Sequence, residues 1–131
     1  MIRVKRVYAP LDQSDGRRFL VDHLWPRGVK KEALRVEAWI KALSPSNGLR
    51  RWFGHDPKKW TEFRRRYFAE LENALESWQP LLEAAEASDI TLVFSAKDVE
   101  HNNAVALQSY LEKKMAAARR KTPQLAGVRA A

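Results

Sequence analysis

The sequence predicts a small α/β domain in which helices cover a mainly parallel sheet of about three strands. Short apolar runs at 2–8, 18–25 and 90–94 have the composition of strands. The stretches between the second and third runs carry apolar residues at spacings of three and four, which is typical of helices. Strands separated by helices favour parallel pairing, and 131 residues suit one domain.

Each predicted strand has its own pattern. Residues 2–8 begin with alternating apolar and basic side chains, which indicates an edge or near-edge strand with one solvent-facing side. Residues 18–25 contain Phe19-Leu20-Val21, and residues 90–94 read ITLVF. Both are near-continuous apolar runs, typical of strands covered on both faces. The segment PLDQSDG at 10–16 is rich in turn-forming residues, so a loop should follow the first strand.

Two short helices are expected before the middle of the chain. Apolar positions between Lys30 and Leu43 predict an amphipathic helix that is interrupted near Arg35. Residues 46–53 predict a second helix, capped by the Ser46 hydroxyl and stopped by Gly54.

The longest helix should begin at Asp56, a favourable N-cap followed by proline. Its apolar stripe continues as far as Leu82. Pro80 lacks an N–H group and clashes with the preceding turn, so we expect a kink or break there, with residues 81–87 continuing as a separate turn or two. A final helix is predicted to start at Asp98.

Positive charge is concentrated at the carboxyl terminus. The chain has 24 Lys and Arg, 16 Asp and Glu and a net charge of +8. Six of the basic residues and no acidic residue follow Glu112, so residues 1–112 carry 18 positive and 16 negative charges. We therefore predict a domain at 1–115 and a basic, disordered tail at 116–131 that serves mainly to keep the protein soluble.

Composition also excludes several classes of protein. There is no cysteine, which excludes disulfides and thiolate chemistry. The start MIRVKRVYAP has no continuous apolar block, so we expect a cytoplasmic protein without a membrane partner. His23 and His55 are isolated and no metal-binding motif occurs, so no metal site is predicted. The sequence identifies no cofactor and no oligomeric state.

The loop after the second strand contains the first group of candidate site residues. Trp25, Pro26 and Gly28 restrict or bend the backbone and hold Arg27 as a rigid fork for a carboxylate or phosphate. Asp22 ends an apolar run and needs a partner, such as Arg27 or backbone amides. Two interpretations stay open: Asp22 and Arg27 staple the loop, or Arg27 captures an anionic ligand.

The loop after the last strand contains the second group. Ser95, Lys97 and Asn102 surround the predicted start of a helix, where backbone N–H groups favour an anion. Asp22 and His101 are the candidate acid and base. The alternative is structural, with Asp98 as the helix N-cap and His101 on a solvated face.

Three functional hypotheses follow. The leading one is a small anionic ligand, phosphorylated or nucleotide-like, bound where the two strand-end loops meet, and it leaves open whether the protein is an enzyme. The second is association with nucleic acid through the basic tail and the Lys58–Arg66 face, although Glu62 can pair with those cations. The third is a protein-interaction module that uses exposed Trp or Leu side chains.

Four segments together resemble the domain of unknown function family 488, the YeaO-like group: KRVY, FLVDHLWPRG, SNGLRRWFGHDPKKWTEFRRRYFAEL and LVFSAKDVEHNNAVAL. The resemblance covers roughly residues 2–115. It implies an α/β fold in a bacterial cytosolic protein, and it assigns no reaction.

Two departures limit what the resemblance carries over. The usual motif reads Asp-Arg-Leu-Trp-Pro-Arg-Gly, whereas His23 replaces the first Arg here, so that cation is not expected. Longer, more distant relatives have a Cys-His-Arg cluster after the last strand, whereas this chain has His101, Asn102 and Asn103. No thiol-dependent role is therefore expected. Some members of the family are labelled as transcription regulators of the MarR type. This chain lacks the helix-turn-helix pattern that such a regulator would need.

Overall fold

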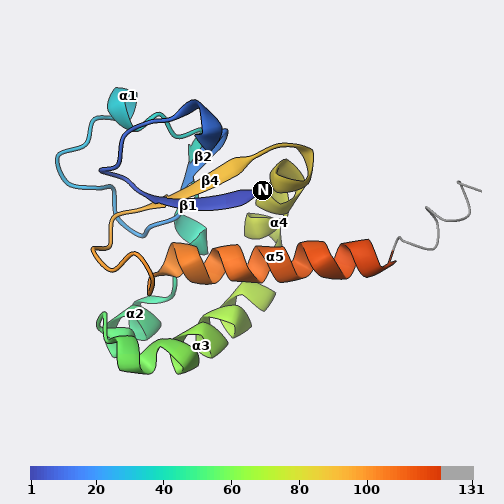
Figure 1. The fold of residues 1–131 in the computed structure, drawn as a ribbon. Helices are drawn as coiled ribbons and strands as arrows, with labels where there is room; N and C mark the ends of the chain where they lie inside the picture. The colour runs from blue at the N-terminus through green and yellow to red at the C-terminus, as the bar shows by residue number, and fades with distance from the viewer. Residues whose placement is uncertain (122–131) are drawn as a thin grey trace, which may run out of the picture.

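A computed structural model describes residues 1–121 and confirms the α/β class. Four parallel strands form one sheet in the order β1-β4-β2-β3 (Figure 1). Their bounds are Ile2–Arg6 for β1, Arg17–Leu20 for β2, Ala38–Trp39 for β3 and Ile90–Phe94 for β4. As predicted, β1 lies at an edge, and β2 and β4 are internal. The sheet has four strands rather than about three.

The additional strand, β3, lies in a stretch for which the sequence predicted a helix. Helix α1 spans only Lys31–Leu34 and ends at Arg35, whose left-handed φ of 51° explains the predicted interruption. The chain then pairs with β2: Glu37 N donates to Arg18 O at 2.7 Å and Ile40 N donates to Leu20 O at 2.8 Å. A helix through Leu43 is therefore wrong, because pairing with a distant strand outweighs the local apolar spacing. A short 3-10 turn, η2, follows at Lys41–Leu43.

Strand β2 is shorter than the predicted strand at 18–25. It ends at Leu20, although Val21 N still donates to Val93 O at 3.3 Å before the chain turns away. Residues 10–16 form the predicted loop, which contains the 3-10 turn η1 at Gln13–Asp15.

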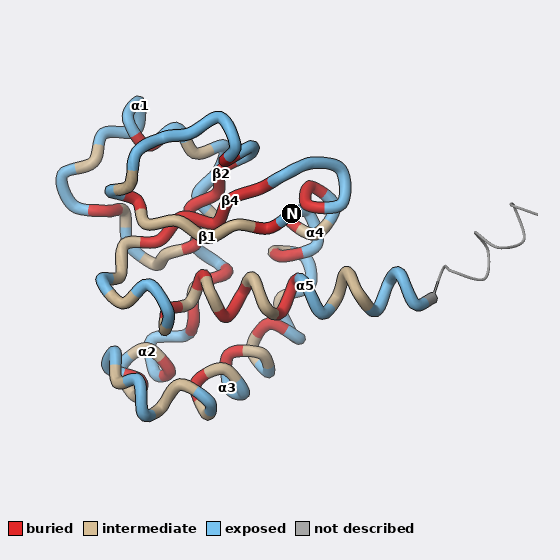
Figure 2. The backbone as a smooth tube through the Cα atoms, viewed as in Figure 1, coloured by how far each residue is buried: buried red, intermediate tan, exposed pale blue. Residues whose placement is uncertain are grey.

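Helices lie on both faces of the sheet, and most of the core lies on one side (Figure 2). That side packs against α5 (Asn103–Lys121), α3 (Trp60–Glu72) and α4 (Leu75–Ala87). A smaller cluster on the opposite face joins the sheet to the α1 region and consists of Val7, Leu20, Leu34 and Val93. The described helices include none that is long and apolar enough to cross a membrane.

The predicted capping signals are confirmed in α2 (Asn47–Phe53) and in the turn η3 (Pro57–Lys59) that leads into α3. Ser46 accepts a hydrogen bond from Leu49 N, and Gly54 ends α2 at a φ of 54°. Asp56 caps η3 through Lys58 N.

The long apolar stripe divides into two helices at Asn73–Ala74, so the break predicted at Pro80 is wrong. Pro80 lies inside α4 and is exposed to solvent. The corner is fixed by packing, since the Trp78 indole donates to Leu71 O at 2.8 Å. Pro80 has no N–H group to donate to the carbonyl one helical turn before it. Because Pro80 is exposed, water can reach that carbonyl, which explains why the helix tolerates the proline.

The last helix, α5, starts at Asn103 rather than Asp98. Asn102 precedes it, and its side chain accepts a hydrogen bond from Val105 N at 3.0 Å. The predicted tail at 116–131 falls partly on α5, which continues to Lys121, and residues 122–131 lie outside the described part of the chain.

Candidate functional site

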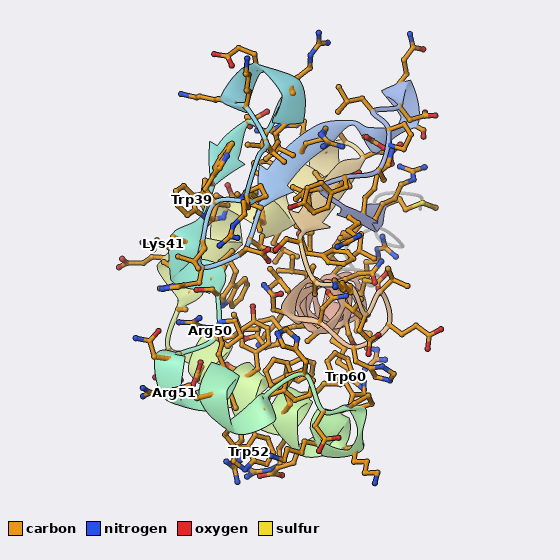
Figure 3. All side chains as sticks on the ribbon, turned by 90° about the vertical axis from the view of Figure 1, so that its left-hand side faces the viewer. Trp39, Lys41, Arg50, Arg51, Trp52 and Trp60 are labelled. Atoms are coloured by element: carbon orange, nitrogen blue, oxygen red, sulfur yellow. The ribbon has the colours of Figure 1, made fainter. Side chains whose placement is uncertain are left out.

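Because all four strands are parallel, their carboxyl ends share one edge of the sheet. The chain leaves β2, β3 and β4 at this edge, on the left of Figure 1. Figure 3 looks onto the same edge. Both loops that the sequence predicted as sites begin here.

A single carboxylate joins the two loops. Asp22 Oδ2 accepts hydrogen bonds from the backbone N and the Oγ of Ser95, both at 2.8 Å. Nearby, Asn103 Nδ2 donates to Val21 O at 2.9 Å. The structure describes both Asp22 and Arg27, and the two side chains form no ion pair with each other. Asp22 therefore holds the two loops together, and its partner is Ser95 in the loop after β4 rather than Arg27.

The Trp-Pro-Arg-Gly turn is built by its backbone. Gly28 has a φ of 75°, as its place in the turn suggested. The Trp25 indole donates to Val29 O at 2.7 Å, and the Tyr8 hydroxyl donates to Arg27 O at 3.2 Å. The Arg27 side chain is exposed, whereas Trp25 packs against the smaller core cluster. The turn thus fixes an indole in place and leaves the arginine in solvent.

In the second loop, the candidate acid-base residue has structural partners. Asp98 accepts from Glu100 N and His101 N at 3.0 Å each, and its Oδ2 lies 3.0 Å from His101 Nδ1. The hydrogen bond from Glu100 N is the main cause that lowers the pKa of Asp98, with further contributions from His101. The His101 ring also contacts Trp60 edge-on, with centroids 5.3 Å apart.

Asn102 is buried, and its Nδ2 donates to Asp98 O at 2.9 Å. Lys97 is exposed, and neither Lys97 nor Arg27 lines the groove beside β3 described below. Among the predicted site residues, the structure brings Asp22 and Ser95 together through hydrogen bonds.

A groove beside β3 contains a residue that sequence reasoning missed. Trp25 and Trp39 pack edge-to-face, with ring centroids 5.7 Å apart and planes at 67°. They line a groove of about 440 Å³ together with Lys31, Val36, Glu37 and Ala38. The volume would hold a small molecule, although the groove is open to solvent. The Trp39 indole donates to Asp22 O at 2.7 Å, yet 39% of Trp39 stays exposed.

The surroundings of this groove are positively charged. Lys41 Nζ lies 5.5 Å from the centroid of the Trp39 ring. Burial lowers the pKa of His23, and the nearby charges of Arg50 and Lys41 lower it further. His23 therefore carries less positive charge near neutral pH than an ordinary histidine. Lys41 and Arg50 lie below Trp39 on the same side of the molecule in Figure 3.

The carboxylate in the groove is already neutralised. Glu37 accepts two hydrogen bonds from Arg17, at 3.0 Å from Nε and 2.5 Å from Nη2. The pKa of Glu37 is lowered chiefly by these bonds. Lys31 and Lys41 form no ion pair with any residue that the structure describes. An anion would therefore find free cations at the groove.

Sequence reasoning missed Trp39 and Lys41 because both were assigned to a helix. A strand of two residues has no periodicity to detect. Nor does a metal site emerge, since the described residues contain no cluster of three or more His, Asp or Glu side chains suited to a metal.

Comparison with known proteins agrees with this architecture of one domain. A family model described as the inactive DUF488-N3 subclade matches residues 1–127. The chain belongs to this subclade. It is 42% identical over 110 residues to the uncharacterized protein YeaO of Escherichia coli K12, which covers 84% of this chain and 96% of YeaO.

Mycobacterial members of similar length are also related. The uncharacterized proteins Rv3073c of Mycobacterium tuberculosis and Mb3100c of Mycobacterium bovis are each 37% identical over 110 residues, or 84% of this chain and 92% of theirs. No solved structure matches the chain. The predicted membership of the DUF488 family is thus confirmed.

Proposed function

We propose that this DUF488-N3 protein is a non-catalytic binding protein for a small nucleotide-like ligand. In this proposal, the flat ring of the ligand occupies the Trp25–Trp39 groove and its phosphate lies near Lys41 and Arg50. The observation that carries the proposal is a pair of fixed indoles beside free cations, in a groove along the edge strand β3 whose Trp39 end lies at the carboxyl edge of the sheet.

Both indoles are held by hydrogen bonds to the backbone, so binding a ring would require little ordering of side chains. Stacking on an aromatic side chain contributes about 1–3 kcal/mol per base. Lys41 Nζ lies over the Trp39 ring, 5.5 Å from its centroid, so the ammonium group is within reach of a phosphate attached to a ring bound in the groove.

Each acid-base candidate has a structural partner on one of its polar atoms. Asp22 accepts two hydrogen bonds from Ser95, and His101 is held between Asp98 and Trp60. A general base needs a free position facing the substrate. The bonds engage Asp22 Oδ2 and His101 Nδ1 and do not by themselves prevent proton transfer, so the description of the subclade as inactive is what favours a binding role.

Isothermal titration calorimetry with adenosine monophosphate, adenosine and inorganic phosphate tests the proposal. The nucleotide should bind more tightly than either of its parts. Trp39→Ala should weaken binding of the nucleotide by about tenfold, and Trp39→Phe should retain most of it, because stacking needs only the aromatic face. Lys41→Ala should weaken the binding of the nucleotide but not the binding of adenosine.

Arg27→Ala and Lys97→Ala are the matched comparison, since both remove an exposed cation from the loops that the sequence singled out. Neither change should alter nucleotide affinity. A loss of binding in these variants, with Trp39→Ala unaffected, would move the site to the loop tips. Absence of any nucleotide binding would refute the proposal.

A further inference from the structure

A line of cationic and aromatic side chains continues from the groove onto α2. Figure 3 shows Trp39, Lys41, Arg50 and Arg51 in turn down one side of the molecule and Trp52 at the bottom, below α2. They belong to β3, η2 and α2 in turn. The groove is therefore one end of a longer surface, which we call the Trp39–Trp52 track.

Carboxylates do not offset the charge of this track. The sequence of α2, NGLRRWF, has no acidic residue. Arg51 is exposed and makes no ion pair within the described chain. On the neighbouring α3, Glu62 is bound by Arg65 and Arg66, and Glu70 accepts from the N and Oγ of Ser46 at 2.9 and 2.6 Å. The cations of the track are left to attract an external polyanion.

A second flat surface lies at the far end of the track. The guanidinium carbon of Arg66 lies 4.1 Å from the centroid of the Trp52 ring, and Lys59 Nζ lies 5.1 Å from it. Arg66 also donates to Glu62 at 2.8 Å, so its planar group is held over the indole. Bases stack on arginine planes as they do on aromatic rings. The track thus has flat groups at both ends and cations between them.

We propose that the ligand of the Trp39–Trp52 track is single-stranded nucleic acid. This inference rests on the proposed function and extends it: one base occupies the groove, the phosphates follow Lys41, Arg50 and Arg51, and a later base stacks on Arg66. In a duplex the base faces are covered by neighbouring bases, so only a single strand uses both ends of the track. A polyanion without bases would contact only the cations of the track and neither of its flat ends.

Fluorescence anisotropy with the full chain tests this inference, using labelled RNA and DNA strands of about ten nucleotides. Either strand should bind at least about tenfold more tightly than adenosine monophosphate, because it contacts both ends of the track. A difference between RNA and DNA identifies which of them is preferred. A duplex and inorganic polyphosphate of equal charge should both bind more weakly.

Arg66→Lys is the decisive variant, because it keeps the charge and removes the planar group. It should weaken single-strand binding by about fivefold or more, which corresponds to the lower limit for stacking of one base. Arg65→Lys is its matched control: Arg65 lies on the same helix and also bonds Glu62, but not over Trp52. The control should leave affinity unchanged.

The salt dependence provides a second readout. Arg51→Ala should reduce the slope of log affinity against log salt by about 0.7, the value for one phosphate contact on a single strand. Lys113→Ala, which removes an exposed cation from α5, should not change the slope.

The outcomes separate the two proposals. If the mononucleotide binds in the groove but the single strand binds no more tightly, or if Arg66→Lys behaves like Arg65→Lys, the nucleic-acid inference is overturned and the proposed function remains. Equal affinity for duplex or polyphosphate would likewise overturn it. Failure of both mononucleotide and single strand to bind would overturn the proposed function itself.

Discussion

At the scale of single residues, Asp22 illustrates how a role depends on a distant partner. Its position after an apolar run predicted that the carboxylate needs a partner and that backbone amides could provide it. The amide belongs to Ser95, which is 73 positions away in the sequence. Nothing in the local sequence identifies that residue, because the proximity arises only when β2 pairs with β4.

Removing Asp22 should destabilise the domain. Asp22→Ala leaves the half-buried Ser95 N–H without its acceptor, so we expect a loss of about 1–3 kcal/mol in the free energy of unfolding. Ser95→Ala removes only the hydroxyl donor and should cost less, about 0.5–1.5 kcal/mol. Urea denaturation measures both changes. An unchanged midpoint for Asp22→Ala would contradict a stabilising role for the hydrogen bonds between Asp22 and Ser95.

Asp15 should make stability depend on acid pH. Burial alone would raise its pKa, but hydrogen bonds from Lys5, the Asp12 backbone and Arg18 outweigh it and lower the pKa below 3.8. Because the folded-state pKa is depressed, this stabilisation is complete above about pH 4 and is lost as pH falls through the folded-state value.

Asp15→Asn should therefore lower the melting temperature at pH 7, and the difference from the parent protein should shrink below about pH 4. Thermal melts followed by circular dichroism across this range measure the effect. A difference that is constant with pH would show that the ionised carboxylate of Asp15 is not its source.

At the scale of elements, capping chemistry was predicted well from the sequence and pairing was not. Ser46 and Gly54 bound α2 as expected, because N-caps and left-handed stops act within a few residues. Strand β3 was missed, since its two residues exist through bonds to β2. The corner at Asn73–Ala74 was missed because no local breaker marks it: the Trp78 indole secures it with a hydrogen bond to Leu71 O.

Gly16 is the element boundary where a side chain cannot be accommodated. It precedes β2 with a φ of 63°, and a Cβ atom there would lie 2.2 Å from Asp89 O. Gly16→Ala should destabilise the domain by more than about 2 kcal/mol, because backbone strain and the clash add. Gly48 is the matched control.

A Cβ atom at Gly48, in the first turn of α2, would meet nothing within 4 Å. Gly48→Ala should leave stability unchanged or raise it by about 0.4–1 kcal/mol, because alanine restricts the unfolded chain. Chemical denaturation of both variants compares them. Equal effects at the two glycines would contradict the close approach of Gly16 to Asp89.

At the scale of the whole molecule, the sequence predicted that the two strand-end loops lie together, but it did not predict the groove beside β3. Parallel strands imply a shared carboxyl edge, and the loops after β2 and β4 do meet there. Trp25 was predicted to restrict the backbone of the first loop, and in the structure it lines the groove beside β3. Its partner Trp39 depends on β3, so the groove could not be predicted without the fourth strand.

The charge of the molecule also changes meaning once the chain is folded. Residues 1–112 carry nearly balanced charges, so the sequence alone indicated that the excess positive charge lies in the tail. In the structure, Glu37, Glu62 and Glu70 are engaged by other side chains or by backbone donors. Lys41 and Arg51 have no ion-pair partner among the residues described. A balanced sequence can therefore still present a cationic surface.

The most direct test of nucleotide binding in the groove uses the indole N–H signals of the five tryptophans. In a two-dimensional ¹⁵N–¹H NMR spectrum, titration with adenosine monophosphate should shift the signals of Trp25 and Trp39. The signals of Trp52, Trp60 and Trp78 should stay in place. Shifts confined to these three, or no shift at all, would contradict a binding site in the Trp25–Trp39 groove.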